Sequence, residues 1–529
     1  MKTIVFTLFM LGLGASVGAQ VPYERILDAA SEPESWLTYS GTYGAQRYST
    51  LDQVNRDNVD QLQPAWTYQT RSLQKFEVSP LVVDGVMYIS EAPSDATALD
   101  LRTGRPVWRY RRSLPDGIVT CCGQVNRGVA LLDDQVFLGT VDAHLVALDA
   151  RTGRVRWDIE VADYTLGYSV TVAPLALKDK IIVGISGGEY GIRGFLDAYD
   201  PLTGERLWRF WTVPGPGEPG HETWSGDSWE RGGAPTWVTG AYDPDLDLLY
   251  WGTGNPGPDF IGDVRRGDNL YSEALIALDP DTGELQWYFQ FLPHDIHDYD
   301  STQVPVLLDA EFEGEQRKLL LFPNRNGFYY VLDRATGEFL VGKQFAKQTW
   351  AQGLDQNGRP IENPETIPSR DGALVYPDDD GAANWYSPTY SPQTELIYQN
   401  VREKGGIYFL ADATYEPGQI YMGASRRVVP GEDPTGFLRA LNPLTGDLVW
   451  EMEVHSPPWA GLMATQGGLV FSGTMEGYFF AADAVTGDVL WRFQTGGAVY
   501  ANPITYLYEG RQFIAIAAGN ALLTFALPE

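Results

Sequence analysis

The chain has 529 residues, a formal net charge of −31 at pH 7 and two cysteines. This acidity argues against a nucleic acid or an anionic membrane surface as a partner, because both bind basic patches, and it favours a basic protein or a cationic ligand. The 57 glycines and the 13% of aromatic residues are typical of an ordered protein in which many strands are joined by tight turns.

The N-terminus has the pattern of a secretory signal peptide. Lys2 precedes an apolar run over residues 4–13, and small residues follow up to Ala19. We therefore expect residues 1–19 to be removed after Ala19 and the mature chain to be periplasmic. No stretch reaches the roughly 18 uninterrupted apolar residues of a membrane-spanning helix, so no membrane span is expected.

An eleven-residue pattern, Ala-x-Asp/Asn-x-x-Thr-Gly-x-x-x-Trp, repeats along the chain. Each copy predicts a hairpin in which the Asp or Asn side chain folds back on the turn, the Gly has a positive φ and the Trp packs between neighbouring repeats. Such repeats predict an all-β fold, an eight-bladed β-propeller with tryptophan-docking repeats, as a single domain over residues 20–529. The copies are residues 98–108, 147–157, 198–208, 277–287, 440–450 and 481–491, with a degraded copy at 331–341 and a remnant around Trp66.

Two insertions rich in Gly and Pro interrupt the repeats, at residues 213–234 and 343–386. Connections of this length are commonly functional loops. We expect both insertions to lie over one mouth of the propeller.

Cys121 and Cys122 are adjacent in the sequence. In an exported protein they can form a disulfide, but a bridge between neighbours closes almost no loop and therefore adds almost no stability. Adjacent Cα atoms lie about 3.8 Å apart, below the roughly 4.4 Å of ordinary disulfides, so the ring is strained and indicates a local role. The alternative is a pair of buried free thiols that act as small apolar residues.

Polar clusters remain once the repeats are set aside. Glu189 lies among glycines, where a backbone can approach a ligand closely, and Asn255 follows another strand. Such oxygen ligands suit a hard cation; a transition-metal pair of His294 and His297 is disfavoured because no third His or Cys is near. Each cluster alone can also be an acidic surface loop. The clusters are SGGEYGIRG (186–194), WGTGNPGP (251–258), PHDIHDYDST (293–302) and PNRNG (323–327).

With the repeats, seven segments resemble the pyrroloquinoline-quinone (PQQ) dependent alcohol dehydrogenases, over nearly the whole mature chain and in the same order. The resemblance implies oxidation of alcohols, primary ones by default, to aldehydes by hydride transfer to PQQ. It also implies that the disulfide between Cys121 and Cys122 lies against one face of the quinone and Trp237 against the other. The segments are CCGQVNRG (121–128), TVAPLALKDKIIVGISGGEYGIRG (171–194), GGAPTWVTGAYDPDLDLLYWGTGNP (232–256), HDIHDYD (294–300), NRNGFYYVLDR (324–334), NWYSPTYSP (384–392) and PPWAGLMATQGGLVFSGTMEGY (457–478).

The resemblance also assigns the remaining site residues. Asp298 is the general base that takes the alcohol proton, and the metal is held by Glu189, Asn255 and Asp298 and polarises the quinone carbonyl. The remaining residues expected to bind PQQ are Arg127, Thr171, Ser186, Gly187, Gly188, Arg325 and Asn384, with Glu77 and Trp459 at the rim.

Asp300 stands where lanthanide-dependent members of the family have Asp and calcium-dependent methanol dehydrogenases have a small uncharged residue. A further carboxylate ligand suits a trivalent ion, so the resemblance implies a lanthanide, with calcium as the second choice. The alternative is that Asp300 is solvated and away from the ion.

Two positions depart from the family pattern: His297 replaces a Trp, and Pro235 replaces a Thr, although Thr236 is adjacent. No Cys-x-x-Cys-His occurs, so no covalent haem domain is expected. Electrons then leave to a separate acceptor, for which the acidic surface favours a soluble basic cytochrome c. The alternative function is a cofactor-free propeller that acts as a binding or assembly scaffold, against which the lack of a lipobox cysteine counts; the oligomeric state stays open.

Overall fold

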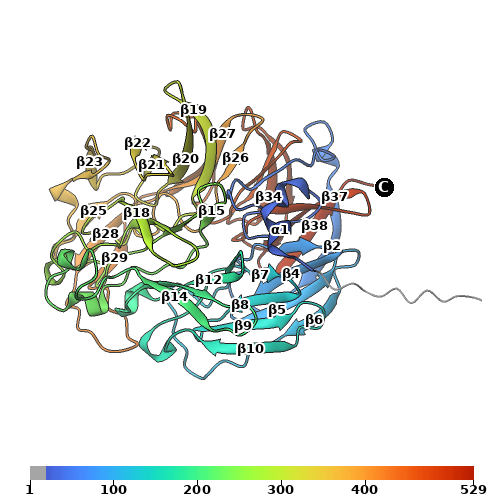
Figure 1. Ribbon diagram of the computed structural model, residues 1–529. Helices are drawn as coiled ribbons and strands as arrows, with labels where there is room; N and C mark the ends of the chain where they lie inside the picture. Colours follow the sequence, from blue (N-terminus) through green and yellow to red (C-terminus); the bar gives the residue numbers. More distant parts are fainter. Residues whose placement is uncertain (1–19) are drawn as a thin grey trace, which may run out of the picture.

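The protein is an all-β propeller, and the computed structural model describes residues 20–529 (Figure 1). The predicted signal peptide, residues 1–19, lies outside the described residues. The first four sheets follow one another along the chain and have four strands each. They are β3 (Leu81–Val83), β4 (Val86–Glu91), β5 (Asp95–Asp100) and β6 (Pro106–Tyr110); β7 (Ala130–Leu132), β8 (Gln135–Gly139), β9 (His144–Asp149) and β10 (Val155–Glu160); β11 (Leu175–Leu177), β12 (Lys180–Gly184), β13 (Phe195–Tyr199) and β14 (Arg206–Trp211); and β15 (Ala241–Asp243), β16 (Leu248–Gly252), β17 (Ala274–Leu278) and β18 (Leu285–Gln290).

Four further sheets complete the set of sheets with four or more strands in the described part of the chain. They are β19 (Val306–Phe312), β20 (Glu315–Pro323), β21 (Phe328–Asp333) and β22 (Phe339–Gln344); β26 (Thr389–Ser391), β27 (Leu396–Glu403), β30 (Thr435–Leu441) and β31 (Leu448–Val454); β1 (Tyr48–Ser49), β32 (Met463–Thr465), β33 (Leu469–Gly473), β34 (Tyr478–Asp483) and β35 (Val489–Gln494); and β2 (Gln63–Gln69), β36 (Ile504–Tyr508), β37 (Arg511–Ala518) and β38 (Ala521–Ala526).

The two ends of the described chain meet in one sheet. Strand β2, near the N-terminus, pairs antiparallel with β38, the last strand, in a register that places Gln63 opposite Ala526. In Figure 1 the blue β2 and the red β38 lie side by side. This pairing closes the ring, so separation of the sheets requires the loss of a full strand pair.

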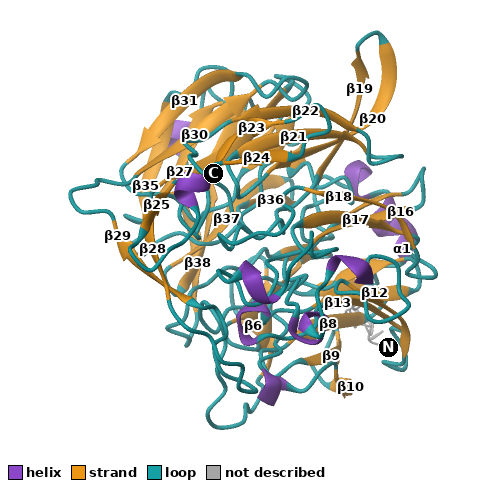
Figure 2. Cartoon of the chain, turned by 90° about the vertical axis from the view of Figure 1, so that its left-hand side faces the viewer, coloured by secondary structure: helices purple, strands orange, loops and turns teal. Residues whose placement is uncertain are grey.

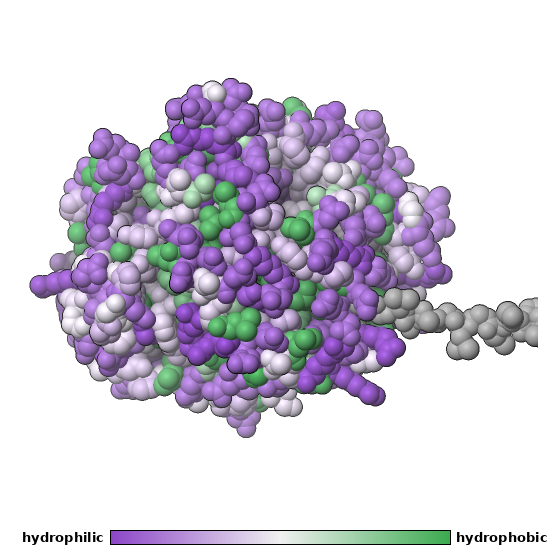
Figure 3. Space-filling model, in the orientation of Figure 1, coloured by the Kyte–Doolittle hydropathy of each residue, from purple (hydrophilic) through white to green (hydrophobic). Residues whose placement is uncertain are grey.

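Burial falls from the inner to the outer strands of a sheet. Every residue of β8 is buried, whereas β10 alternates between exposed and half-buried positions. Continuous apolar strands therefore build the interior, and the outermost strands face solvent. The surface is largely hydrophilic in the view of Figure 3, in keeping with the net charge of −31.

The repeated sequence forms the expected turn. Asp100 Oδ1 accepts a hydrogen bond from Thr103 N (3.0 Å), and Gly104 has a φ of +66°. A Cβ on Gly104 would lie 2.4 Å from the ring of Trp66, so only glycine fits beneath the indole. The turn chemistry predicted from the repeat is confirmed.

Seven of the eight repeats also carry a tryptophan that donates a hydrogen bond to the next repeat, and the degraded copy has Val341 at the corresponding position. Trp66 Nε1 donates to Leu101 O (2.8 Å), and this partly buried polar contact joins two sheets. The corresponding pairs are Trp108 with Ala150, Trp157 with Pro201, Trp208 with Pro280, Trp287 with Arg334, Trp450 with Ala484, and Trp491 with Leu62.

Short helices and small sheets lie outside the eight main sheets, and part of them fall in the insertions (Figure 2). A third insertion, residues 404–434 between β27 and β30, was not predicted; it forms a hairpin that pairs with a strand of the second insertion. Among residues 20–529, no helix has the length and apolar character needed to cross a membrane. The elements are α1 (Tyr23–Leu27), η1 (Ala29–Ser31), η2 (Val59–Gln61), η3 (Tyr164–Leu166), η4 (Gly188–Tyr190), η5 (His221–Thr223), η6 (Ser228–Arg231), η7 (Gly262–Val264), η8 (Pro364–Thr366), β23 (Ala351–Leu354), β24 (Pro360–Glu362), β25 (Ala373–Val375), β28 (Gly406–Leu410) and β29 (Ala424–Val428).

Candidate active site

A cavity of about 330 Å³ lies at one end of the sheets. Its walls come from two kinds of connection: those that join the last strand of a sheet to the next sheet, and those between a sheet's second and third strands. Because antiparallel strands alternate in direction, both kinds emerge at the same end. The lining is Lys75, Glu77, Cys121, Cys122, Val125, Arg127, Ser169, Thr171, Ser186, Gly187, Glu189, Pro235, Trp237, Asp298, Asp300, Arg325, Asp379, Asp380, Asn384, Trp385, Met422, Arg426 and Trp459.

The cavity therefore brings together all the predicted site residues except Gly188 and Asn255. Both lie directly behind its wall: a Cβ on Gly188 would be 2.5 Å from Asn255 Oδ1. Gly187, the neighbouring residue of the wall, has a φ of +123°, and a Cβ there would meet Gly167 O at 2.3 Å. Gly188 thus allows the backbone to approach Asn255, and Gly187 allows it to approach Gly167.

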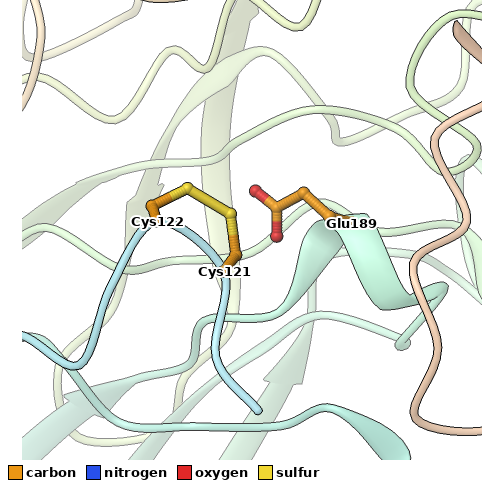
Figure 4. Close-up of side chains that lie close together, drawn as sticks. All are labelled: Cys121, Cys122 and Glu189. Atoms are coloured by element: carbon orange, nitrogen blue, oxygen red, sulfur yellow. A yellow bond between two sulfur atoms is a disulfide. The ribbon is translucent and has the colours of Figure 1, made fainter. Parts of the chain in front are cut away.

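Cys121 and Cys122 form a disulfide, so the alternative of two free thiols is wrong. The pair faces the carboxylate of Glu189 across the cavity (Figure 4), and the sulfur and carboxylate atoms lie within 4.8 Å of one another. Because the sulfurs are bonded to each other, they are not available as thiolate ligands for a metal. They present instead a small apolar surface to the cavity.

The buried guanidinium group of Arg127 forms another wall of the cavity. Arg127 Nη2 lies 2.9 Å from Glu77 Oε2, and its Nη1 donates to Thr171 Oγ1 at 2.9 Å. Its guanidinium carbon is 4.7 Å from the ring centroid of Trp237. The hydroxyl of Thr171 in turn lies 2.7 Å from that of Ser186. Arginine and two hydroxyls beside an indole suit a flat ligand that carries carboxylates.

Asp300 connects the opposite walls. Its Oδ1 accepts from Asn255 N (2.9 Å), and its Oδ2 accepts from Arg325 Nη1 (2.6 Å) and Trp237 Nε1 (3.2 Å). Asp300 is buried, so the part of the alternative that places its side chain in solvent is wrong; its role as a metal ligand stays a prediction.

Two oxygens near Asp300 lack partners. Asn255 Oδ1 and Asp298 Oδ1 are buried, and neither has a hydrogen bond within the described part of the chain. A buried acceptor without a partner costs on the order of 1–3 kcal/mol. Such oxygens, beside the carboxylate of Glu189, are the donor set that a hard cation prefers.

The surroundings of Glu189 and Asp298 disfavour the ionised form of their carboxyl groups. Burial raises the pKa of Glu189 to about 7, and Asp300 adds to the shift. Burial also raises the pKa of Asp298 well above its usual range; Asp259 adds to that effect, while Arg325, whose Nη2 is 4.0 Å from Asp298 Oδ2, opposes it. A cation among these groups would favour their ionised forms.

Comparisons with known proteins agree with this geometry. The sequence model of the PQQ family "Glucose/ethanol/alcohol dehydrogenase, beta-propeller domain" matches residues 36–353 and 426–514. The chain belongs to the PQQ-dependent alcohol dehydrogenases. It is therefore an oxidoreductase of the quinoprotein alcohol dehydrogenase family.

Relatives in this family cover almost the whole chain. The quinoprotein alcohol dehydrogenase PedH of Pseudomonas putida is 40% identical over 96% of this chain and 90% of its own length. A lanthanide-dependent methanol dehydrogenase of Methylacidiphilum fumariolicum is 38% identical, over 96% and 88% respectively. A solved structure of a europium-containing methanol dehydrogenase superimposes with a TM-score of 0.90 at 35% identity, over 95% of this chain and all of that one.

The donor set and the walls fit the PQQ family's cofactor and a metal ion. The unpartnered oxygens of Asn255 and Asp298 suit the ion, and Arg127 and Arg325 suit a ligand that carries carboxylates. The disulfide and the Trp237 ring both border the same cavity, as flat apolar surfaces against which a planar ring can pack.

The two departures from the family pattern have different surroundings. Pro235 lines the cavity, but Thr236 does not compensate: its hydroxyl donates to Phe195 O (2.6 Å), accepts from Ile185 N (2.9 Å) and is fully buried. His297 is outside the lining and stacks on Tyr299, with ring centroids 5.3 Å apart.

The two histidines of the cluster at 293–302 do not form a metal pair. His297 Nε2 lies 3.2 Å from Thr366 O, whereas His294 Nδ1 lies 2.8 Å from Gly267 O. Each ring is thus directed to a different backbone carbonyl.

Several residues of the cavity wall were missed in the sequence. Met422 and Arg426 come from the unpredicted insertion, and no repeat or motif marks them. Asp379 and Asp380 belong to an acidic run just before Asn384 that was visible in the sequence. The other missed residues are Lys75, Val125, Ser169 and Trp385.

Proposed function

We propose that this protein is a periplasmic dehydrogenase that oxidises primary alcohols to aldehydes with PQQ and a lanthanide ion, and passes the electrons to a separate soluble cytochrome c. The observation that carries the proposal is the pair of buried, unpartnered oxygens, Asn255 Oδ1 and Asp298 Oδ1, in and directly behind the wall of a cavity that also holds the disulfide. The acidic surface supports a basic partner. The lanthanide-dependent and europium-containing relatives support the choice of metal.

We further propose that the eight sheets with four or five strands are the eight blades of the propeller, and that seven tryptophans each dock one blade on the next. The hydrogen bonds from the indoles to the carbonyls of the following repeat support this assignment. It makes residues 20–529 a single domain with the cavity at one mouth.

Asp298 is the proposed general base. When bound, PQQ and the cation supply a polarised quinone carbonyl that accepts a hydride. The Asp298 carboxylate takes the hydroxyl proton of the alcohol as the hydride leaves the adjacent carbon, so that the alcohol loses two electrons and two hydrogens. Arg325, near both Asp298 and Asp300, holds the two carboxylates in place.

The remaining site residues are proposed to bind the two cofactors. Glu189, Asn255, Asp298 and Asp300 would hold the cation. The disulfide and Trp237 would sandwich the quinone ring, and Arg127 would pair with one of its carboxylates. The proposed PQQ-binding residues are Glu77, Cys121, Cys122, Arg127, Thr171, Ser186, Gly187, Gly188, Trp237, Arg325, Asn384 and Trp459.

Dye-linked oxidation of a panel of alcohols tests the proposal. The purified protein is supplied with PQQ and with La³⁺, Ca²⁺ or no metal. Turnover with La³⁺ supports a lanthanide-dependent dehydrogenase. Turnover with Ca²⁺ alone would support a dehydrogenase and contradict the choice of a lanthanide. No turnover in any sample, with no quinone absorbance retained after desalting, would favour a cofactor-free scaffold.

A further inference from the structure

Asp259 lies behind the proposed cation site and lines no part of the cavity. It is fully buried, and its Oδ1 accepts a hydrogen bond from Asn255 Nδ2 at 2.8 Å. No sequence motif singled it out. Its position raises the question of why a carboxylate is buried beside residues that already carry several negative charges.

The hydrogen bond fixes the orientation of the Asn255 amide. The NH₂ of Asn255 is the donor in this contact and the carboxyl oxygen of Asp259 is the acceptor, so the NH₂ faces Asp259. Its Oδ1 then points to the opposite side, toward Gly188, where it is buried without a partner in the described chain. This is the orientation in which the amide oxygen is available to a cation.

The Asp259 carboxylate is not neutralised by a direct ion pair among residues 20–529. The buried Arg265 donates to the backbone oxygens of Pro258 (3.1 Å) and Asp259 (3.0 Å) and to Asn269 Oδ1 (2.9 Å). These bonds hold the loop, and none of them reaches the side chain of Asp259. Asp259 Oδ2 is buried and unpartnered. A cation at the proposed site would favour the ionised form of the Asp259 carboxyl group, and the negative charge of that group would then act on the ion in a medium of low polarity.

We propose that Asp259 is a positioning residue of the cation site: it aims the Asn255 oxygen at the ion and adds a buried negative charge that favours a trivalent over a divalent ion. The inference rests on the proposed function, because the cation site is part of it. Residues that orient ligands in this way typically contribute 10- to 100-fold to metal affinity.

Two substitutions separate the two effects. Asp259→Asn keeps an oxygen that accepts from Asn255 and removes only the charge, whereas Asp259→Ala removes both. Asp263→Asn is the matched control, because Asp263 is an exposed acid in the same loop. Binding of Tb³⁺ and of Ca²⁺ is measured for the full-length mature protein with PQQ present, by competition with a metal-indicating dye.

We expect Asp259→Ala to weaken Tb³⁺ binding by about 10- to 100-fold. Asp259→Asn should weaken Tb³⁺ binding by a smaller factor, and its effect on Ca²⁺ should be smaller still, because the energy of a charge pair grows with the charge of the ion. Asp263→Asn should bind both ions as the wild type does. Wild-type affinity for both ions in Asp259→Asn and Asp259→Ala would overturn the inference.

Thermal unfolding without metal shows whether Asp259→Ala folds. If it does not, the ratio of Tb³⁺ affinity to Ca²⁺ affinity in Asp259→Asn decides. A ratio below that of the wild type supports the inference, and an unchanged ratio overturns it. Alcohol oxidation is assayed in the same samples. If the proteins oxidise alcohol and the Asp259 variants bind metal as the wild type does, the inference about Asp259 is wrong and the proposed function stands. If Tb³⁺ binding depends on Asp259 but no alcohol is oxidised, the proposed function is wrong and the inference stands. If the wild type binds no Tb³⁺, both are wrong.

Discussion

Asp300 and Arg325 form a buried ion pair, with Asp300 Oδ2 2.6 Å from Arg325 Nη1, at the point where the proposed quinone and cation sites meet. The other oxygen of Asp300 accepts from the backbone of Asn255. One carboxylate is thus connected both to a guanidinium that suits an anionic cofactor and to a proposed metal ligand. This arrangement couples the two halves of the site.

Asp300→Asn tests whether this carboxylate contributes charge to the cation. The variant keeps the size of the side chain, and we expect La³⁺ affinity to fall by at least the roughly 10- to 100-fold typical of residues that only orient ligands. Ca²⁺ affinity should fall less. The measurement is metal binding with PQQ present, with Asp263→Asn as control; an equal effect on both ions would contradict a charge-based role.

Replacement of both cysteines by serine tests the disulfide as a cofactor surface. A bridge between neighbours closes almost no loop, so thermal stability without cofactor should change little. PQQ retention after desalting should drop, because two polar hydroxyls replace an apolar face of the cavity. Retention equal to the wild type would show that the disulfide has another role, whereas a large fall in thermal stability would assign it to the fold.

The raised pKa of Glu189 predicts a pH dependence of the cation-free protein. Its ordinary value of 4.5 rises to about 7 in the folded state, so between these values the folded chain holds a proton that the unfolded chain has lost. The free energy of unfolding without metal should therefore fall as the pH rises from about 4.5 to 7. Added cation should stabilise the protein more at pH 7 than at pH 5; denaturant unfolding at both pH values, with and without La³⁺, checks this. Equal stabilisation at the two pH values would contradict a proton on Glu189.

Met422→Ala tests the wall supplied by the third insertion. Met422 lines the cavity, and its backbone oxygen accepts from Phe260 N at 3.0 Å, which holds it beside the metal-site loop. Removal of its side chain should raise kcat/KM for longer alcohols relative to ethanol by about tenfold, as for changes of a few methylenes in an apolar pocket. Met452→Ala, at a half-buried methionine outside the cavity lining, is the control. If kcat/KM for longer alcohols relative to ethanol is the same in Met422→Ala and Met452→Ala, Met422 does not form part of the wall that limits the substrate.

The sequence predicted the repeated turns because their chemistry is local. A positive φ at Gly104 and the indole of Trp66 above it follow from residues within one repeat and its neighbour. The second insertion was expected to contribute to the site because breaks in a regular pattern are visible, and it supplies part of the cavity wall, whereas residues 213–234 of the first insertion supply none of the lining. Residues of the cavity such as Asp298 depended on the resemblance to a family, because spacing alone does not distinguish a ligand from an acidic loop.

The remaining features depend on packing between distant segments. Met422 reaches the cavity only because the hairpin of β28 and β29 folds back over residues 189 and 260, with Tyr421 N donating to Glu189 O at 2.6 Å. The bond between Asn255 and Asp259 depends on the exact path of a loop held by Arg265. Neither contact has a periodic or compositional signal.

A single turnover of the PQQ-loaded, metal-loaded protein tests the central claim most directly. The quinone absorbance is followed without oxygen or dye after mixing with ethanol, for the wild type and for Asp298→Asn. We predict rapid loss of the oxidised quinone signal in the wild type and a rate lower by about 10²- to 10⁴-fold in the variant, which is the usual contribution of a general base, with the quinone bound in both. An unchanged rate in Asp298→Asn, or a wild type whose bound quinone is not reduced by any alcohol, would contradict the account.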